Sequence, residues 1–131
     1  MKLLLDTHIL LWSLLEPARL ARGVSAELED TSNELWLSPI STWEIMVLAE
    51  KGRIVLDARP ELWVRDVFKT IPFHEAPLNH EVAMQSRMID FPHEDPADRF
   101  LVATALVYDL KLITADKRII ASQACSILPG N

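Results

Sequence analysis

Short apolar runs and stretches of helical apolar spacing alternate along the chain. Residues 2–5 form an apolar run that ends at a polar residue, which is the pattern of a short buried strand. The same reasoning predicts further strands over residues 34–37, 71–75, 111–113 and 125–128. Helices are predicted over residues 7–15, 19–30, 40–51, 60–69, 79–88, 96–108 and 117–121, with Gly52 just beyond the third of them.

This alternation predicts an α/β fold, in which a mainly parallel sheet carries helices on both faces. Residues 96–108 are apolar on nearly all sides, so we expect this helix to be buried. The sequence shows no internal repeat, low-complexity tract or linker. We therefore expect residues 1–131 to form one domain.

The composition is that of an ordinary globular protein, with 50% hydrophobic and 24% charged residues. Apolar runs such as residues 9–12 are far shorter than the roughly 20 residues that a membrane span needs. Asp6 and His8 interrupt the apolar start, and no small-residue cleavage site follows, so a secretory signal is not expected. The single cysteine, Cys125, cannot form an internal disulfide. These features predict a soluble cytoplasmic protein with no membrane-bound part.

The net charge changes the expected partners. With 19 acidic and 13 basic residues the chain carries a charge of −6, which disfavours a general nucleic-acid-binding protein because phosphate contacts need Lys and Arg. A nuclease is still compatible with this charge, since it can gather carboxylates in a metal site and keep its cations on the rim.

Four acidic residues lie near the predicted carboxyl ends of strands, where α/β folds bind ligands. Asp6 directly follows a predicted strand, and Asp116 comes three residues after the end of another. Glu44 comes shortly after another strand, and Asp98 opens the apolar helix. Clustered carboxylates repel one another unless a cation lies among them, and Mg²⁺ and Mn²⁺ prefer oxygen ligands. Zinc is less favoured, because there is no cysteine pair and no two histidines stand at a usual metal spacing.

The same acids have a second interpretation as helix caps. Asp6, Asp95 and Asp116 each stand directly before a predicted helix, and Asp98 lies near the positive end of one. Residues 41–44 match the S-x-x-E capping box, in which the glutamate bonds back to the serine backbone. A residue at a helix start can also face a cleft, so spacing leaves both roles open.

Four segments together resemble the PIN-domain nucleases, and among them the VapC toxins of prokaryotic toxin–antitoxin pairs. These segments are residues 3–12, 38–45, 93–105 and 112–116, and they follow one another in the family's order. The third segment, His-Glu-Asp-Pro-Ala-Asp-Arg-Phe-Leu-Val-Ala-Thr-Ala, is the most specific match. The resemblance covers nearly the whole chain.

The resemblance implies a three-layer α/β/α sandwich and a Mg²⁺- or Mn²⁺-dependent endoribonuclease, with products bearing a 5′-phosphate and a 3′-hydroxyl. The family's acidic positions fall on Asp6, Glu44, Asp98 and Asp116. Of these, Asp6, Asp98 and Asp116 would hold the metal, while Glu44 would activate water or complete a second metal site. The resemblance also implies a homodimer, an RNA substrate and a VapB-like antitoxin as partners.

Several residues near these motifs receive supporting roles. Asp95 could be a ligand, a partner of a ligand or only a cap, and the hydroxyls of Thr7 and Thr114 could bond to a carboxylate. Arg99, Lys117 and Arg118 lie beside the acidic motifs and could guide the RNA backbone, although a solvated surface role fits each of them as well. Arg99 could instead pair with a nearby carboxylate.

Two other functions stay open. A catalytically inactive PIN-fold interaction module would keep the fold and use its apolar helices for partners. Another phosphate-handling α/β hydrolase or receiver-like domain would also place an aspartate after the first strand, but a receiver needs an acidic pair there and a lysine after its last strand, which this chain lacks. The four tryptophans are expected to pack in the core or an interface rather than to stack on bases, and Trp63 could lie on a helix that docks a partner. We expect no catalytic role for the histidines, and Cys125 to be a small buried apolar residue.

Overall fold

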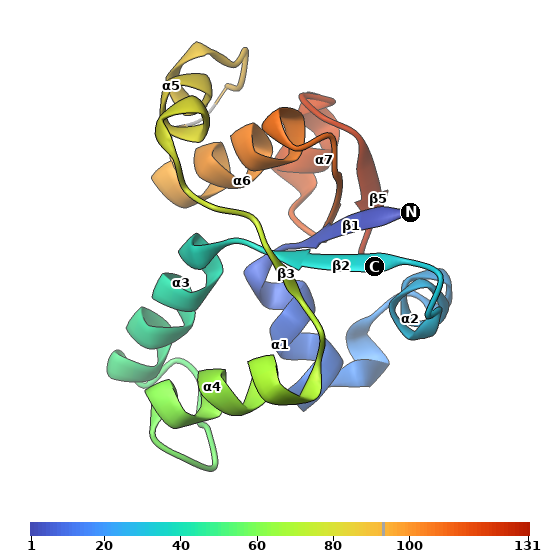
Figure 1. Ribbon diagram of the computed structural model, residues 1–131, viewed down its shortest axis with the longest axis vertical. Coiled ribbons are helices and arrows are strands. Elements are labelled where there is room, and N and C mark those ends of the chain that lie inside the picture. The colour runs from blue at the N-terminus through green and yellow to red at the C-terminus, as the bar shows by residue number, and fades with distance from the viewer. Residues whose placement is uncertain (93) are drawn as a thin grey trace.

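The computed structural model of the chain describes residues 1–92 and 94–131, so that His93 of the third segment lies outside the described residues. Five strands and seven α-helices alternate along this part of the chain, with one short 3₁₀ helix at Pro17–Arg19 (Figure 1). In chain order they are β1 (Lys2–Leu5), α1 (Thr7–Leu15), α2 (Arg22–Glu29), β2 (Glu34–Leu37), α3 (Pro39–Glu50), α4 (Pro60–Thr70), β3 (His74–Glu75), α5 (His80–Met88), α6 (Pro96–Val107), β4 (Lys111–Thr114), α7 (Lys117–Ser122) and β5 (Ile127–Pro129).

The strands form one sheet in the order β3-β2-β1-β4-β5, and every pairing in it is parallel. β1 lies at the centre, where Leu4 pairs with Trp36 of β2 on one side and Leu112 of β4 on the other. The chain builds the sheet outward from β1 to β3, then returns to the other side of β1 to add β4 and β5. The strand order therefore reverses between β1 and β4, and in open α/β sheets this is where ligands bind.

Helices cover both faces of the sheet, which confirms the expected α/β/α layers. Helices α1 to α4 lie on one side of the sheet and α5 to α7 on the other (Figure 1). No helix in residues 1–92 or 94–131 combines the length and apolar character needed to cross a membrane.

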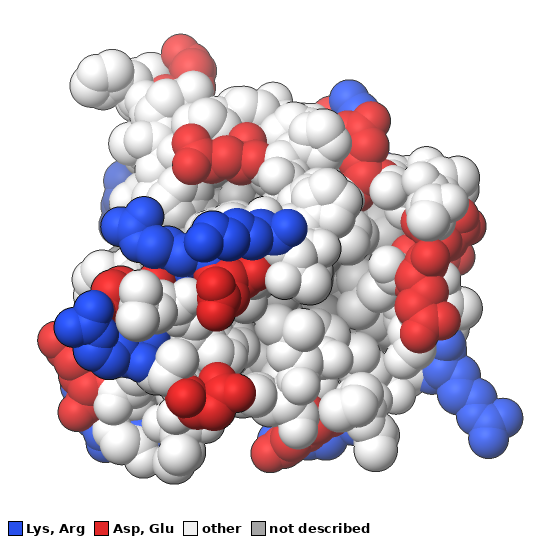
Figure 2. Space-filling model, turned by 60° about the horizontal axis from the view of Figure 1, so that its bottom comes forward, with Lys and Arg blue, Asp and Glu red and all other residues white. Residues whose placement is uncertain are grey.

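Charged side chains are scattered over the surface. On the face drawn in Figure 2, Lys and Arg side chains lie beside Asp and Glu side chains, and most of the surface is uncharged. This face therefore has no continuous basic area for a nucleic-acid backbone.

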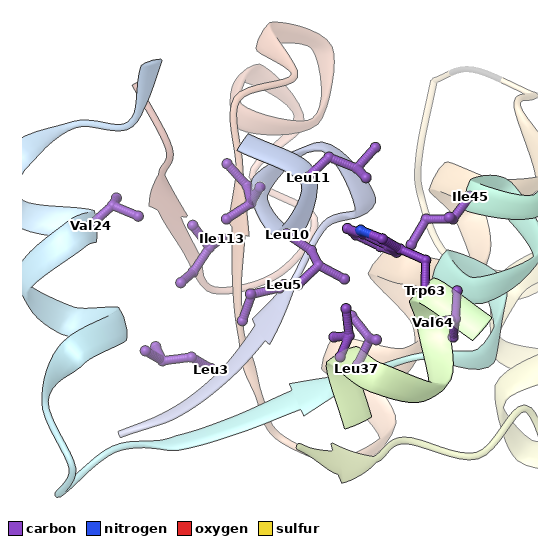
Figure 3. Close-up of a cluster of buried hydrophobic side chains, with 12 residues drawn as sticks. Leu3, Leu5, Leu10, Leu11, Val24, Leu37, Ile45, Trp63, Val64 and Ile113 are labelled. Atoms are coloured by element: carbon purple, nitrogen blue, oxygen red, sulfur yellow. The ribbon is translucent and has the colours of Figure 1, made fainter. Parts of the chain in front are cut away.

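Two apolar cores hold the layers together, one on each face of the sheet. Because successive strand residues point to opposite faces, Leu3 and Leu5 of β1 enter the first core, drawn in Figure 3, and Leu4 enters the second. The first core joins α1 to α4 to the sheet, and Trp63 of α4 is buried in it. The second core is built largely on α6, in which residues 101–105 are all buried, as its apolar composition predicts.

Most element boundaries agree with the sequence-based prediction, and the exceptions have local causes. The single helix expected over residues 19–30 is a 3₁₀ turn followed by α2, with Leu20 and Ala21 extended between them. The strand expected over residues 71–75 shrinks to His74–Glu75, because Pro72 has no N–H for the ladder and Phe73 N donates to Ile71 O at 2.8 Å. Gly52 has the positive φ of 67° expected of a glycine beyond a helix end.

Three of the four tryptophans pack in or against the two cores. Trp12 and Trp36 are partly buried against the two cores, and Trp63 is buried. Trp43 is 58% exposed, so it lies outside both cores, and packing in an interface stays a prediction for this residue. The only cysteine, Cys125, is half-buried against the second core, and burial raises the pKa of its thiol to about 11.

Candidate active site

The predicted acidic residues meet in one cleft of about 360 Å³ at the carboxyl ends of β1 and β4. The cleft is lined by Asp6, His8, Trp12, Glu44, Asp95, Asp98, Ala115, Asp116 and Arg118. The four acids expected at the site, together with Asp95, therefore come together at the point where the strand order reverses.

Asp6 is fixed by its position directly after β1. One carboxylate oxygen, Oδ1, accepts from His8 N at 3.3 Å and caps α1, while Oδ2 accepts from Thr114 Oγ1 at 2.6 Å. Burial raises the pKa of this carboxyl, and the hydrogen bond from Thr114 offsets part of that rise. The predicted support from Thr114 is thus seen as a bond from the neighbouring strand.

Glu44 reaches the cleft from inside α3. The helix begins at Pro39, and its cap is Ser38, whose Oγ accepts from Ile40 N at 3.1 Å. The capping box predicted for residues 41–44 is therefore wrong, because Ser41 is already helical and its side chain is buried against Thr7. Thr7 Oγ1 lies 2.7 Å from Glu44 Oε1 and 2.9 Å from Ser41 Oγ, so its hydroxyl orients the glutamate. Burial, more than any other cause, raises the pKa of Glu44.

Asp95 and Asp98 enter the cleft from the start of α6. Asp95 Oδ1 accepts from Ala97 N at 3.0 Å and from Asp98 N at 3.3 Å, so the predicted cap is confirmed. Asp98 lies in the first turn with its side chain 16% exposed. Burial, followed by the repulsion of the other carboxylates in the cleft, raises the pKa of Asp98 to about 7.

Asp116 completes the group from the N-terminus of α7. Its Oδ1 accepts from Arg118 N at 2.8 Å and from Ile119 N at 3.3 Å, which confirms this cap as well. Partial burial opposes ionisation of Asp116, but hydrogen bonds from Arg118 and Ile119 outweigh it and lower the pKa.

The three basic residues near the motifs have different surroundings. Arg118 is 62% exposed and places Nη2 at 3.4 Å from Asp116 Oδ2 and 3.6 Å from Asp98 Oδ2. Lys117 is exposed beside it. The expectation that Arg99 guides RNA is wrong, because this residue is only 4% exposed. Its guanidinium donates to the carbonyl oxygens of Ser86 at 2.8 Å, Phe91 at 2.9 Å and Ile89 at 3.3 Å, and so ties the end of α5 and the residues just beyond it to the start of α6.

Two aromatic residues of the cleft were not predicted. His8 and Trp12 are four residues apart and thus lie on the same face of α1 as it leaves Asp6. The Arg19 guanidinium lies 4.1 Å from the centre of the Trp12 ring. The i, i+4 spacing of His8 and Trp12 indicated that they share a face of the helix. It could not indicate that this face lines the cleft, because the direction of α1 relative to the cleft is known only from the structure.

The donor set suits a divalent cation bound by oxygen. In the described part of the chain no three His, Cys, Asp or Glu side chains are already arranged to enclose a metal. A hard divalent ion does not require that, because it keeps several waters and commonly takes only one or two carboxylates. Such an ion would also offset the repulsion between carboxylates that adds to the effect of burial on the pKa of Asp98.

Comparisons with known proteins agree with this fold and site. The sequence model of the PIN domain matches residues 3–123. The chain is 34% identical over 119 residues to the ribonuclease VapC22 of Mycobacterium tuberculosis, which covers 88% of each chain. The chain therefore belongs to the PIN-domain family, in its VapC ribonuclease branch. Enzymes of this family generally use a divalent metal ion.

Solved structures show the same fold at low sequence identity. VapBC2 from Rickettsia felis, bound to a DNA fragment from its promoter, aligns over 100% of both chains with a TM-score of 0.75 and 13% identity. DNA-bound VapBC from Salmonella typhimurium aligns over 98% of both chains with a TM-score of 0.72 and 17% identity. These likenesses extend the agreement from the sequence motifs to the whole architecture.

Proposed function

We propose that this chain is an endoribonuclease that uses Mg²⁺ or Mn²⁺ and serves as the toxin of a toxin–antitoxin pair. The observation that carries the proposal is the meeting of Asp6, Glu44, Asp98 and Asp116 in one cleft at the carboxyl ends of β1 and β4. The similarity to a ribonuclease VapC supports RNA as the substrate.

Three carboxylates are suited to hold the metal. Asp6, Asp98 and Asp116 come from three different elements and converge on the same cleft. When bound, the divalent ion supplies charge stabilisation to the phosphate and lowers the pKa of water. Thr114 keeps Asp6 oriented through the 2.6 Å hydrogen bond to its Oδ2.

Glu44 is suited to act as the general base that takes a proton from the attacking water. It is held by Thr7, and its raised pKa favours proton uptake nearer to neutral pH than an ordinary glutamate would allow. In the proposed reaction Glu44 accepts a proton from the attacking water, the water oxygen bonds to phosphorus in line, the bond to the 3′ oxygen breaks, and that oxygen takes up a proton from solvent water. The products carry a 5′-phosphate and a 3′-hydroxyl.

The partners follow from the relatives. The two structural neighbours described above are complexes named VapBC, so a VapB-like antitoxin is the proposed protein partner. The resemblance to the VapC family makes a homodimer the proposed assembly. A cytoplasmic location would give the enzyme access to RNA.

The experiment compares RNA cleavage by the wild type with cleavage by Asp98→Asn and Glu44→Gln. Asn keeps most of the shape of Asp, and Glu44 makes no cap in this structure, so both variants should fold. The wild type should cleave RNA with Mg²⁺ or Mn²⁺ and stop with a chelator, and both variants should be inactive. The metal should raise the melting temperature of the wild type but not that of Asp98→Asn.

The same experiment tests the alternative of an inactive interaction module. A folded wild type that neither cleaves RNA nor gains stability from either metal would contradict the proposed function. Cleavage that persists in folded Asp98→Asn would contradict the assignment of the site.

A further inference from the structure

Arg118 lines the acidic cleft and lies close to two of its carboxylates. Its Nη2 is 3.4 Å from Asp116 Oδ2 and 3.6 Å from Asp98 Oδ2. The two carboxylates belong to different helices, since Asp98 is in the first turn of α6 and Asp116 caps α7. One nitrogen therefore bridges two elements that would otherwise bring like charges together.

The contacts of Arg118 with the two carboxylates are weak enough to be replaced by another cation. Both contacts are long, both use the same nitrogen, and the Arg118 side chain is 62% exposed. Exposed ion pairs without two-pronged geometry contribute little to stability. By contrast, the buried guanidinium of Arg99 is fixed by three carbonyl oxygens and cannot leave.

Arg118 is also the one Lys or Arg among the residues that line the cleft, in the part of the chain that the structure describes. Five of the lining residues are acidic, so a phosphodiester entering the cleft would meet carboxylates on nearly every side. A bound divalent ion offsets part of this charge, and among the described lining residues the exposed guanidinium of Arg118 is the one permanently cationic side chain able to bind a phosphate oxygen.

We propose that Arg118 is an exchangeable counter-ion of the cleft, which holds Asp98 and Asp116 together until a divalent ion takes their oxygens and then binds the RNA phosphate. This inference rests on the proposed function. Arg118 would first compete with the metal for the two carboxylates and then bind the substrate. The exchange needs no change of protonation, because a guanidinium stays charged at any working pH.

The first test measures Mn²⁺ affinity by calorimetry or by electron paramagnetic resonance, without RNA. Arg118→Gln should bind Mn²⁺ about twofold to fivefold more tightly than the wild type, the range expected when an exposed ion pair no longer competes. Lys117→Gln is the matched control, because it removes the same charge one position away and Lys117 takes part in no ion pair found among the described residues. Its affinity should change by less than about twofold, as expected for an exposed charge at a distance.

The second test measures cleavage of a single-stranded RNA at saturating Mn²⁺. Arg118→Gln should raise KM by about fivefold or more while kcat changes less, and it should reduce the dependence of log(kcat/KM) on log salt by about 0.7 to 1, the effect of one lost phosphate contact. Lys69→Gln on α4, which contributes no residue to the cleft lining, should leave KM and the salt dependence as they are in the wild type.

Folding is checked by circular dichroism, and the substitution leaves the backbone N–H of residue 118 in place to bond with Asp116. Unchanged or weaker Mn²⁺ binding in folded Arg118→Gln would overturn the exchange. An unchanged KM would overturn the phosphate contact. If the wild type itself neither binds Mn²⁺ nor cleaves RNA, the proposed function fails and this inference fails with it. If the wild type is active and Arg118→Gln has the same Mn²⁺ affinity and KM, only the inference is contradicted.

Discussion

Replacing Asp98 by Asn should stabilise the metal-free protein, which is the opposite of what the loss of a structural aspartate does. Asp98 lies among four other carboxylates, and burial together with their repulsion raises its pKa from 3.8 to about 7. The folded state therefore holds on to the Asp98 proton more strongly than the unfolded chain does. Below pH 3.8 both states are protonated and the group contributes nothing to the pH dependence. As the pH rises from there towards 7, the unfolded chain loses the proton first, so stability falls.

The size of the effect follows from that difference in pKa. The interval from 3.8 to about 7, at about 1.4 kcal/mol for each pH unit, gives an upper limit of about 4 kcal/mol. Water at the open mouth of the cleft screens part of the repulsion, and the lost contact with Arg118 costs up to about 1 kcal/mol. We therefore expect Asp98→Asn to gain about 1–3 kcal/mol at pH 8.

The assay is urea unfolding in a chelator at pH 8 and at pH 5, with the m-value checked for two-state behaviour. The advantage of Asp98→Asn should shrink at pH 5, where the wild type keeps the proton on Asp98. Asp116→Asn serves as the control, because hydrogen bonds lower the pKa of Asp116 and its removal should give no gain. Asp98→Asn that is equal to or less stable than the wild type at pH 8 would refute the view that the cleft holds repelling carboxylates.

Substitutions at three further positions test the supporting residues. Thr7→Val removes the hydroxyl 2.7 Å from Glu44 and should lower kcat about tenfold with a stability loss of about 1–2 kcal/mol, whereas an unchanged pH–rate profile would argue against its orienting role. Arg99→Met leaves three buried carbonyl oxygens without their donor and should cost about 3 kcal/mol or more in urea unfolding; a stable variant with weakened RNA binding would restore the role in RNA guidance that the structure contradicts. Asp95→Ala should lose about 1 kcal/mol with the cap, and Asp95→Asn should keep both stability and Mn²⁺ affinity. Weakened Mn²⁺ binding in folded Asp95→Asn would make Asp95 a ligand.

The sequence predicted the layers and the meeting of the acids because both depend on strand order along the chain. Asp6 and Asp116 follow buried strands, and parallel strands end at the same edge of a sheet. Local spacing did not identify the N-cap of α3, because two serines lie near its start. Ser38 and Ser41 both precede a helical pattern, and the choice of Ser38 as cap depends on Pro39 occupying the first helical position. That choice moves Glu44 from a backbone contact into the cleft.

Arg99 shows a different limit. Its neighbours in sequence suggested an RNA contact, but it stands on a helix whose residues 101–105 are all buried. The nearly continuous apolar character of that helix was the signal that the charge at its start would also be enclosed. The carbonyl oxygens that bind it could not be predicted, because Ser86 near the end of α5 and Ile89 and Phe91 beyond it come close to Arg99 only when α5 packs on α6.

The two interpretations of the acids, as caps or as site residues, are compatible because a carboxylate has two oxygens. In Asp6 and Asp116, Oδ1 accepts from the backbone of the following helix. Oδ2 is then left for the cleft, where it meets Thr114 in one case and Arg118 in the other. The capping hydrogen bond holds the carboxylate through Oδ1, and Oδ2 still faces the cleft. A residue at a helix start can therefore serve as a cap and as a metal ligand together. This division also explains why Asn is the informative substitution, since it can keep the capping oxygen and removes only the charge.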